Sequence, residues 1–186
     1  SFKRLVSKCQ ANINGQLLLN ARVQTALNNF YSASGMELKP LQKEYISSYA
    51  YSQLPSDMAS RLLEVIDLYF SYKLKEQHFL EENKGLTRLE VLSEVNFIRK
   101  HILGEQVSNG LFLERSLRTE YYLRLAEIKQ SASLNEEDKA RLLLEHENKG
   151  IKNGVIRSYP VNENNRKNKR SIKSRAWYQR NFINHV

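Results

Sequence analysis

Glycine and proline are scarce in this chain, and that scarcity constrains its fold more than any other feature. The 186 residues include seven Gly and three Pro. An all-β architecture needs these residues at its many tight turns and is therefore disfavoured, whereas long segments free of both favour helices. No segment alternates apolar and polar residues for long enough to predict a strand. The sequence therefore predicts an all-α protein.

The clearest helical pattern lies in residues 21–33. Five apolar residues there follow the i, i+3, i+4, i+7, i+8 spacing of one helix face: Val23, Ala26, Leu27, Phe30 and Tyr31. Gly35 follows at the position where a helix commonly ends in a left-handed conformation. We therefore expect an amphipathic helix that is terminated by Gly35.

Start and stop signals predict the other elements. Asn14-Gly15 is a turn signal, Pro40 is placed to open a helix, and Ser56 is expected to cap the start of the next one. Two pairs have the spacing of a capping box: Thr87 with Glu90, and Ser133 with Glu136. Asn109-Gly110 is expected to interrupt the helical sequence between these two capping boxes.

Three parts are expected along the chain. The apolar stripes are narrow and flanked by Lys, Glu, Gln and Asn, which favours an elongated multi-helix scaffold over one compact core. Residues 1–54 are predicted to form a small N-terminal helical mini-domain, and residues 55–148 an extended helical domain. Residues 149–186 are Asn-rich and basic, and we expect a basic C-terminal arm or a shortened second mini-domain.

The net charge of +9 is concentrated in that last part. Residues 1–148 hold 19 Lys or Arg and 19 Asp or Glu, whereas residues 149–186 hold 10 Lys or Arg and one acidic residue, Glu163. The body of the chain is therefore charge-balanced, and the whole excess belongs to the arm.

No catalytic, metal-binding or cofactor-binding pattern emerges. Cys9 is the single cysteine, so it has no second Cys with which to form a disulfide or hold a metal. The four histidines lie apart, and His146, between two glutamates, is expected to be a solvated helix position. No apolar run reaches the roughly 18 residues that a membrane-spanning helix needs. We expect a protein that is not an enzyme and needs no cofactor or metal.

Four short motifs follow one another between residues 89 and 147: Leu103-Gly104-Glu105, Leu111-Phe112, Leu125-Ala126-Glu127-Ile128 and Asp138-Lys139-Ala140. Their order and spacing resemble those of the lipase-specific foldases, which are steric chaperones of secreted bacterial lipases. Each motif is short, and the order in which they occur carries the resemblance.

A second segment resembles the signature helix of the same family, Arg-x-x-Phe-Asp-Tyr-Phe/Cys-Leu-Ser/Thr-Ala. Residues 22–35 match its apolar frame and its Ser-Ala-x-Gly end, but Asn28 and Asn29 replace Asp-Tyr, and Gln24 replaces the Arg. The resemblance implies a client-binding set of Arg22, Gln24, Leu27, Asn28, Asn29, Phe30, Tyr31, Ser32, Ala33 and Gly35. Its expected apolar anchors are Leu27, Phe30 and Tyr31.

The resemblance also implies a function. The expected partner is a secreted lipase, phospholipase or related esterase, bound as a 1:1 client and assisted in folding to its active state. The expected location is the bacterial periplasm, with membrane attachment only through an anchor upstream of Ser1. The replacements at Asn28 and Asn29 indicate a client that differs from the usual one.

The arm suggests a different function, nucleic-acid binding. It combines six cations with aromatic residues, and the expected contacts are Arg166, Lys167, Lys169, Arg170, Lys173, Arg175 and Trp177. Cations neutralise phosphates and aromatic side chains stack on bases, although the same arm also suits solvent or an acidic protein surface. Because the charge-balanced body offers no basic face to continue such a contact, the foldase interpretation is preferred.

Overall fold

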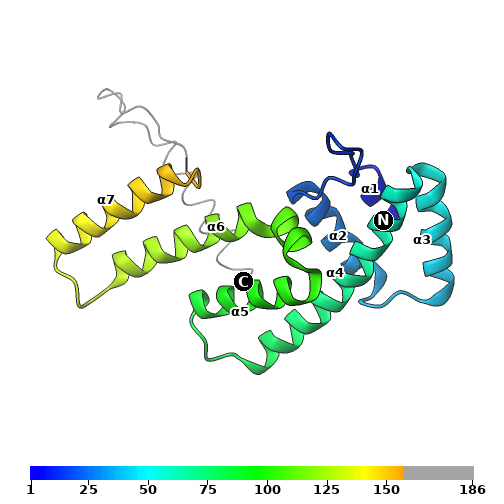
Figure 1. Ribbon diagram of the computed structural model, residues 1–186. Helices are drawn as coiled ribbons and strands as arrows, with labels where there is room; N and C mark the ends of the chain where they lie inside the picture. Colours follow the sequence, from blue (N-terminus) through cyan, green and yellow to red (C-terminus); the bar gives the residue numbers. More distant parts are fainter. Residues whose placement is uncertain (157–186) are drawn as a thin grey trace. The chain divides into compact units, whose positions relative to one another are not determined.

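Helices make up the computed structural model, which describes residues 1–156 (Figure 1). Their order is α1 (Phe2–Val6), α2 (Ala21–Ser34), α3 (Pro40–Gln53), α4 (Ser56–Glu82), α5 (Arg88–Leu103), α6 (Glu105–Gln130) and α7 (Glu136–Lys152). Within residues 1–156 no strand forms, and an isolated bridge joins Ala11 to Leu17. The predicted all-α fold is confirmed.

Two compact units divide the chain inside α6. The first is Ser1–Ser116, and the second begins at Leu117. These units do not coincide with the ranges 1–54 and 55–148 expected from the sequence. Helices on both sides of residue 54 contribute buried side chains to the same hydrophobic core, and the division between units falls much later in the chain.

Aromatic rings fill the core of the first unit where α1, α2 and α4 meet. The centroid of the Phe30 ring lies 5.4 Å from that of Phe2 and 5.7 Å from that of Phe70. Tyr31 meets Phe70 edge-on, with 4.9 Å between centroids. Tilted and edge-on pairs of this kind are the arrangements that aromatic rings prefer. The apolar face predicted for residues 21–33 is therefore the buried face of α2.

Helix α4 is central to this unit. It packs against α2 and α3, and it packs most extensively against α5, which follows it along the chain (Figure 1). Buried residues recur along it at alternating intervals of four and three: Met58, Leu62, Val65, Tyr69, Tyr72 and Glu76. This spacing keeps one stripe of the helix against its neighbours. A carboxylate, that of Glu76, occupies the last of these buried positions.

Several helix ends follow the predicted signals. Gly35 ends α2 with φ 75°. The start of α2, for which no cap was predicted, is capped by Asn20, whose Oδ1 accepts hydrogen bonds from two backbone N–H groups of the first turn. Pro40 is the first residue of α3. Thr87 and Glu90 form the predicted capping box at the start of α5. The ends at Gly35, Pro40 and Thr87 depend on local sequence alone, which is why the pattern predicted them.

Two predicted caps are wrong. Pro55 occupies the cap position of α4, so Ser56 is the first residue of the helix rather than its cap. At the start of α7, Asn135 takes the position expected for Ser133, and its Oδ1 accepts a hydrogen bond from the backbone N–H of Asp138 at 2.8 Å. Asn and Ser are comparable caps, so the choice between neighbouring candidates depends on where the chain enters the helix.

The turn predicted at Asn14-Gly15 is confirmed. Asn12 Oδ1 accepts hydrogen bonds from the backbone N–H groups of Asn14 at 2.8 Å and of Gln16 at 3.0 Å, and Gly15 adopts φ 75°. The turn reverses the chain, and Leu17 beyond it is buried in the core.

The interruption predicted at Asn109-Gly110 is wrong, because both residues lie within α6. A methyl group at Gly110 would lie 2.8 Å from Leu19 Cβ and 3.3 Å from the Leu19 carbonyl oxygen. The glycine therefore allows two segments of the chain to approach closely rather than forming a turn.

In the second unit, His146 of α7 packs against Tyr121 of α6. Its ring is stacked on that of Tyr121, with 4.4 Å between centroids, and its Nε2 lies 2.8 Å from the Tyr121 carbonyl oxygen. A carbonyl oxygen only accepts, so Nε2 carries the hydrogen and donates it. The prediction of a solvated position for His146 is therefore wrong, because its glutamate neighbours in sequence lie on other faces of the helix.

Candidate functional site

The client-binding residues implied by the family resemblance lie on α2 and at its C-terminal end, on different faces of the helix. The exposed members are Arg22, Asn29, Ser32, Ala33 and Gly35. The buried members are Gln24, Leu27, Phe30 and Tyr31, and Asn28 is half-buried.

The three expected apolar anchors are core residues. Leu27 has no exposed surface, and Phe30 and Tyr31 each expose 5% of theirs. Their burial follows from the apolar spacing itself, because the stripe that makes α2 amphipathic is the face that packs on the rest of the unit. In this structure they do not offer an exposed apolar edge to a partner.

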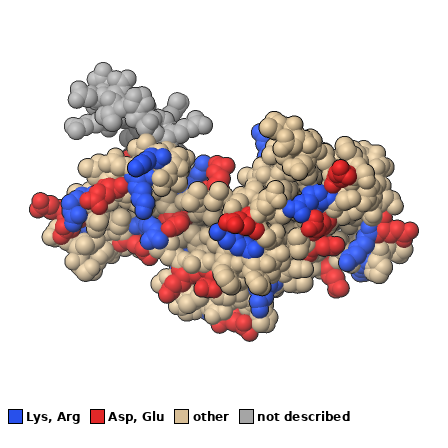
Figure 2. All heavy atoms as spheres, viewed as in Figure 1, with Lys and Arg blue, Asp and Glu red and all other residues tan. Residues whose placement is uncertain are grey.

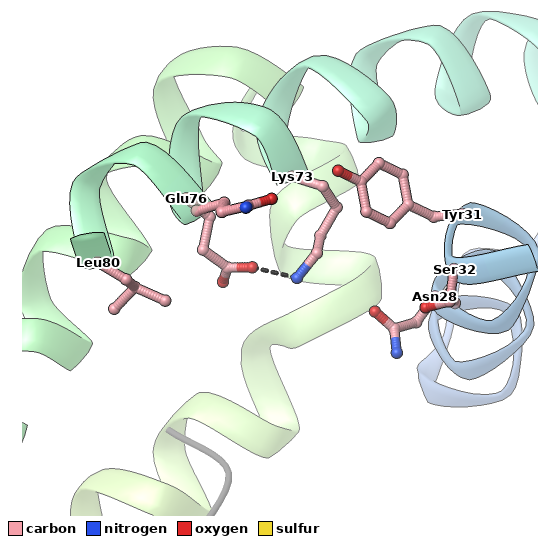
Figure 3. A pocket seen from close by; sticks show the side chains of 7 residues that line it. Asn28, Tyr31, Ser32, Lys73, Glu76 and Leu80 are labelled. Atoms are coloured by element: carbon pink, nitrogen blue, oxygen red, sulfur yellow. Dashed lines mark hydrogen bonds and ion pairs between the residues drawn. The ribbon is translucent and has the colours of Figure 1, made fainter. Parts of the chain in front are cut away.

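An open hollow of about 320 Å³ lies between α2 and α4 (Figure 3). Its lining consists of Asn28, Tyr31 and Ser32 from α2, and Lys73, Glu76, Gln77 and Leu80 from α4. The structure thus brings three of the expected contact residues together with a charged segment of α4 that the sequence analysis did not single out.

The Tyr31 hydroxyl is buried at this hollow without a hydrogen-bond partner among the described residues. Figure 3 shows the hydroxyl directed from α2 toward the Lys73 side chain. Burial raises the pKa of Tyr31, and the negative charge of Glu76 raises it further. The hydroxyl therefore keeps its proton at neutral pH and remains an unused donor.

Glu76 is a buried carboxylate that receives three donors. Its Oε1 accepts from the Tyr72 hydroxyl and, at 3.4 Å, from the Arg99 guanidinium. Its Oε2 accepts from the Lys73 ammonium, the contact dashed in Figure 3. Burying a carboxylate is costly unless it is paired and hydrogen-bonded, and here two cations and a hydroxyl offset that cost.

Arg99 of α5 extends this network toward α6. Its guanidinium donates to the Tyr72 hydroxyl oxygen at 3.0 Å and to Asn96 Oδ1 at 3.1 Å. It also donates to Ser116 Oγ at 3.3 Å. The guanidinium carbon lies 4.2 Å from the centroid of the Phe112 ring, a favourable position for a cation over an aromatic face. Side chains from three helices are thereby held around one charged group.

Burial keeps several titratable groups of the first unit protonated. Burial is the main cause that raises the pKa of Tyr69 and of Tyr72. Burial also raises the pKa of the Cys9 thiol to about 11, and a thiol that remains protonated is a poor nucleophile. Residues 1–156 contain no group of three His, Cys, Asp or Glu that could hold a metal ion.

Glu76 and Arg99 are the residues that sequence analysis missed, although a signal was present. Glu76 continues the four-and-three spacing that runs through Tyr69 and Tyr72. Arg99 lies four residues after Val95, next to the buried Ile98. Charged residues are almost never fully buried unless paired. A glutamate on the apolar stripe of one helix and an arginine on the apolar stripe of the next are therefore expected to pair with each other.

Cations and anions are interspersed on the face of the molecule seen in Figure 2. Arg141, for example, pairs with Asp138 at 3.1 Å and with Glu145 at 3.3 Å. This pattern agrees with the balanced charge of residues 1–148. The expected nucleic-acid contacts, at positions 166–177, lie outside the described residues.

Within residues 1–156, the structure has no helix that combines the length and the apolar character needed to span a membrane. Comparisons with protein-family models, with curated proteins and with solved structures found no match to this chain.

Proposed function

We propose that this protein is a steric chaperone of the lipase-foldase type, which binds a secreted lipase or lipase-like esterase and assists its folding. The proposal includes the periplasmic location that such a client implies. Support comes from the ordered motifs of residues 89–147 and from the signature-like segment of residues 22–35.

One observation of the fold carries the proposal furthest. Asn28, Tyr31 and Ser32, which the resemblance assigns to client binding, line one hollow together with Lys73 and Glu76. A helix that served only as scaffold would need no more than a buried apolar stripe, which α2 has. The polar edge of α2 additionally faces an open hollow that contains an unused hydrogen-bond donor, and this arrangement suits contact with another molecule.

A steric chaperone works by differential binding. Affinity for the barrier state of client folding accelerates the step, whereas equal affinity for all client states does not. Because the anchors expected on α2 are buried, the contact on this helix is proposed to be mainly polar, made by its exposed edge at Asn29, Ser32 and Ala33. No chemical step is required of the chaperone.

The test is reactivation of a denatured client. The client is the Gly-x-Ser-x-Gly esterase encoded nearest to this chain, unfolded in urea and diluted with or without an equimolar amount of the chaperone. We expect esterase activity to return only when the chaperone is present. Equal recovery with and without the chaperone would refute the proposal.

A matched pair of variants locates the contact. Ser32 and Ser71 are both exposed helical serines whose hydroxyls donate to the carbonyl oxygen four residues earlier. Ser32→Trp is expected to block reactivation, because it adds bulk to the proposed contact, whereas Ser71→Trp is expected to leave it intact. If the two variants reactivate the client equally well, α2 is scaffold and not a contact.

Nucleic-acid binding is the alternative, favoured by the concentration of positive charge in residues 149–186. Binding through phosphates weakens steeply as salt rises, because each contact releases counterions. We expect weak binding that is lost at physiological salt and on deletion of residues 149–186. Tight, salt-tolerant and sequence-selective binding would favour the alternative over the chaperone.

A further inference from the structure

The Tyr31 hydroxyl is a buried hydrogen-bond donor in the first unit. Tyr31 exposes 5% of its surface, and its ring already packs against Phe70. Within residues 1–156 its hydroxyl has no hydrogen-bond partner. A phenylalanine would make the same ring contact without leaving a polar atom unpaired. An unpartnered buried hydroxyl lowers stability, so its presence points to a use that the free protein does not show.

Lys73 supplies further donors to the same hollow. Its ammonium has three N–H groups, and it pairs with Glu76. The Lys73 side chain is 24% exposed and lines the hollow together with Tyr31. Because the lysine side chain is flexible, its ammonium is able to serve a second acceptor without leaving Glu76.

The group formed by Lys73, Glu76 and Arg99 carries an excess of positive charge. The Glu76 carboxylate is paired with Lys73, which lines the hollow, and with Arg99, which does not, so the three groups together carry one positive charge. Glu76 itself already accepts three hydrogen bonds, so its own acceptor capacity is largely used. An added cation would meet this excess charge, whereas an added acceptor would be attracted by it.

We infer that the hollow between α2 and α4 binds a carboxylate, through hydrogen bonds from the Tyr31 hydroxyl and the Lys73 ammonium. Leu80 lines the same hollow and is partly exposed, so an aliphatic stem beside the carboxylate finds an apolar contact. A volume of about 320 Å³ is at the small end for ligand pockets. It suits a glutamate side chain or a short-chain carboxylic acid.

Two sources provide such a group. One is an acidic side chain of a protein client, and this assignment rests on the proposed chaperone function. The other is a free carboxylic acid. The chemistry recognised is the same, and binding measurements combined with client reactivation separate the two sources.

Binding is measured on the full chain by NMR, with butyrate as probe and butyramide as its uncharged counterpart. Butyrate is expected to shift the resonances of Tyr31 and Ser32 in a saturable way, and butyramide is not. Equal shifts with both compounds, or none with butyrate, would overturn the inference.

Two variants assign the donors. Tyr31→Phe and Lys73→Met are each expected to weaken butyrate binding about tenfold or more, the usual effect of losing a hydrogen bond to a charged group. Lys75→Met is the control, because Lys75 is an exposed lysine of the same helix that does not line the hollow. Tyr31→Phe is expected to keep or raise the melting temperature, which separates lost binding from lost folding. If Tyr31→Phe binds butyrate as the parent does, the inference fails.

Client reactivation then identifies the source. Reactivation that is slowed by butyrate and by Tyr31→Phe, but not by butyramide or Lys75→Met, assigns the site to an acidic side chain of the client. Butyrate binding without any effect on reactivation assigns it to a free carboxylic acid. Failure of the chaperone proposal looks different, since the parent chain would then reactivate no client while butyrate binding persisted.

Discussion

The Arg99 guanidinium on α5 lies 3.4 Å from Glu76 Oε1 on α4, and the side chains expose only 15% and 11% of their surfaces. Removing one member of a buried pair leaves the other charge without compensation. Glu76→Ala is therefore expected to lower the free energy of unfolding by about 3–5 kcal/mol. Denaturant unfolding of the parent and the variant measures the change.

An exposed ion pair on the same helix provides the control. Arg61 and Glu64 are 2.6 Å apart, but their side chains are 35% and 55% exposed. Exposed pairs contribute little, so Glu64→Ala is expected to cost less than about 1 kcal/mol. A similar cost for the two glutamates would mean that the Glu76 network is not a stabilising unit.

Phe30 provides a second prediction, which separates core from surface on α2. Because Phe30 is 5% exposed and contacts two other rings, Phe30→Ala is expected to cost about 3–5 kcal/mol of stability. Leu41→Ala is the control, since Leu41 is 80% exposed. Thermal unfolding of both variants is the measurement, and a Phe30→Ala variant as stable as the Leu41→Ala variant would contradict the packing of Phe30 against Phe2 and Phe70.

Gly110 provides a third prediction, which concerns its close approach to Leu19. A helix interior normally gains about 1 kcal/mol when Gly becomes Ala, yet the added methyl group would lie 2.8 Å from Leu19 Cβ. Gly110→Ala is expected to be destabilising by about 1–3 kcal/mol, the usual cost of overpacking. Gly85→Ala, where no atom lies within 4 Å of the new methyl group, is expected to be close to neutral. A stabilising Gly110→Ala would show that the segment around Leu19 yields easily.

The capping box of α5 predicts a dependence on pH. Glu90 Oε2 accepts from the Thr87 hydroxyl at 2.7 Å and from the Thr87 backbone N–H at 2.8 Å. These bonds lower the pKa of Glu90 below its usual 4.5. A carboxyl with a depressed folded-state pKa stabilises the fold above its unfolded pKa, and that contribution is lost as the pH falls through the folded pKa.

We therefore expect the parent chain to be more stable than Glu90→Gln at neutral pH, with a difference that shrinks as the pH falls below 4.5. Glu94→Gln, an exposed position on the same helix, serves as the reference variant. Urea unfolding across this pH range measures the difference. A difference between parent and Glu90→Gln that stays constant with pH would exclude the carboxylate as the source.

Local sequence patterns predict the helices of this fold, but they do not predict which helices contact one another. The stripe of α2, its end at Gly35 and the Thr87 box follow from residues a few positions apart, and periodicity registers those relationships. Gly110 illustrates the opposite case. Its role depends on Leu19, which lies far away in sequence, and a helical glycine without that neighbour looks like an interruption.

The candidate site divides in the same way. The family resemblance pointed to α2, and Asn28, Tyr31 and Ser32 of that helix do line the hollow. It did not indicate Lys73 or Glu76, because their relation to α2 exists only once α4 packs against it. Burial also decided against Leu27, Phe30 and Tyr31 as exposed anchors, since an apolar stripe alone does not say whether it meets the protein's own core or a partner.

The network around Arg99 also fixes how far α5 slides along α4. One turn of an α-helix advances about 5.4 Å, and apolar stripes tolerate such a shift because one aliphatic residue replaces another. The shift would place an aliphatic side chain such as Val95 opposite Glu76 and would leave Arg99 without a carboxylate. A shift by one turn would therefore bury the Arg99 guanidinium without its carboxylate, and the network selects one alignment of α5 on α4.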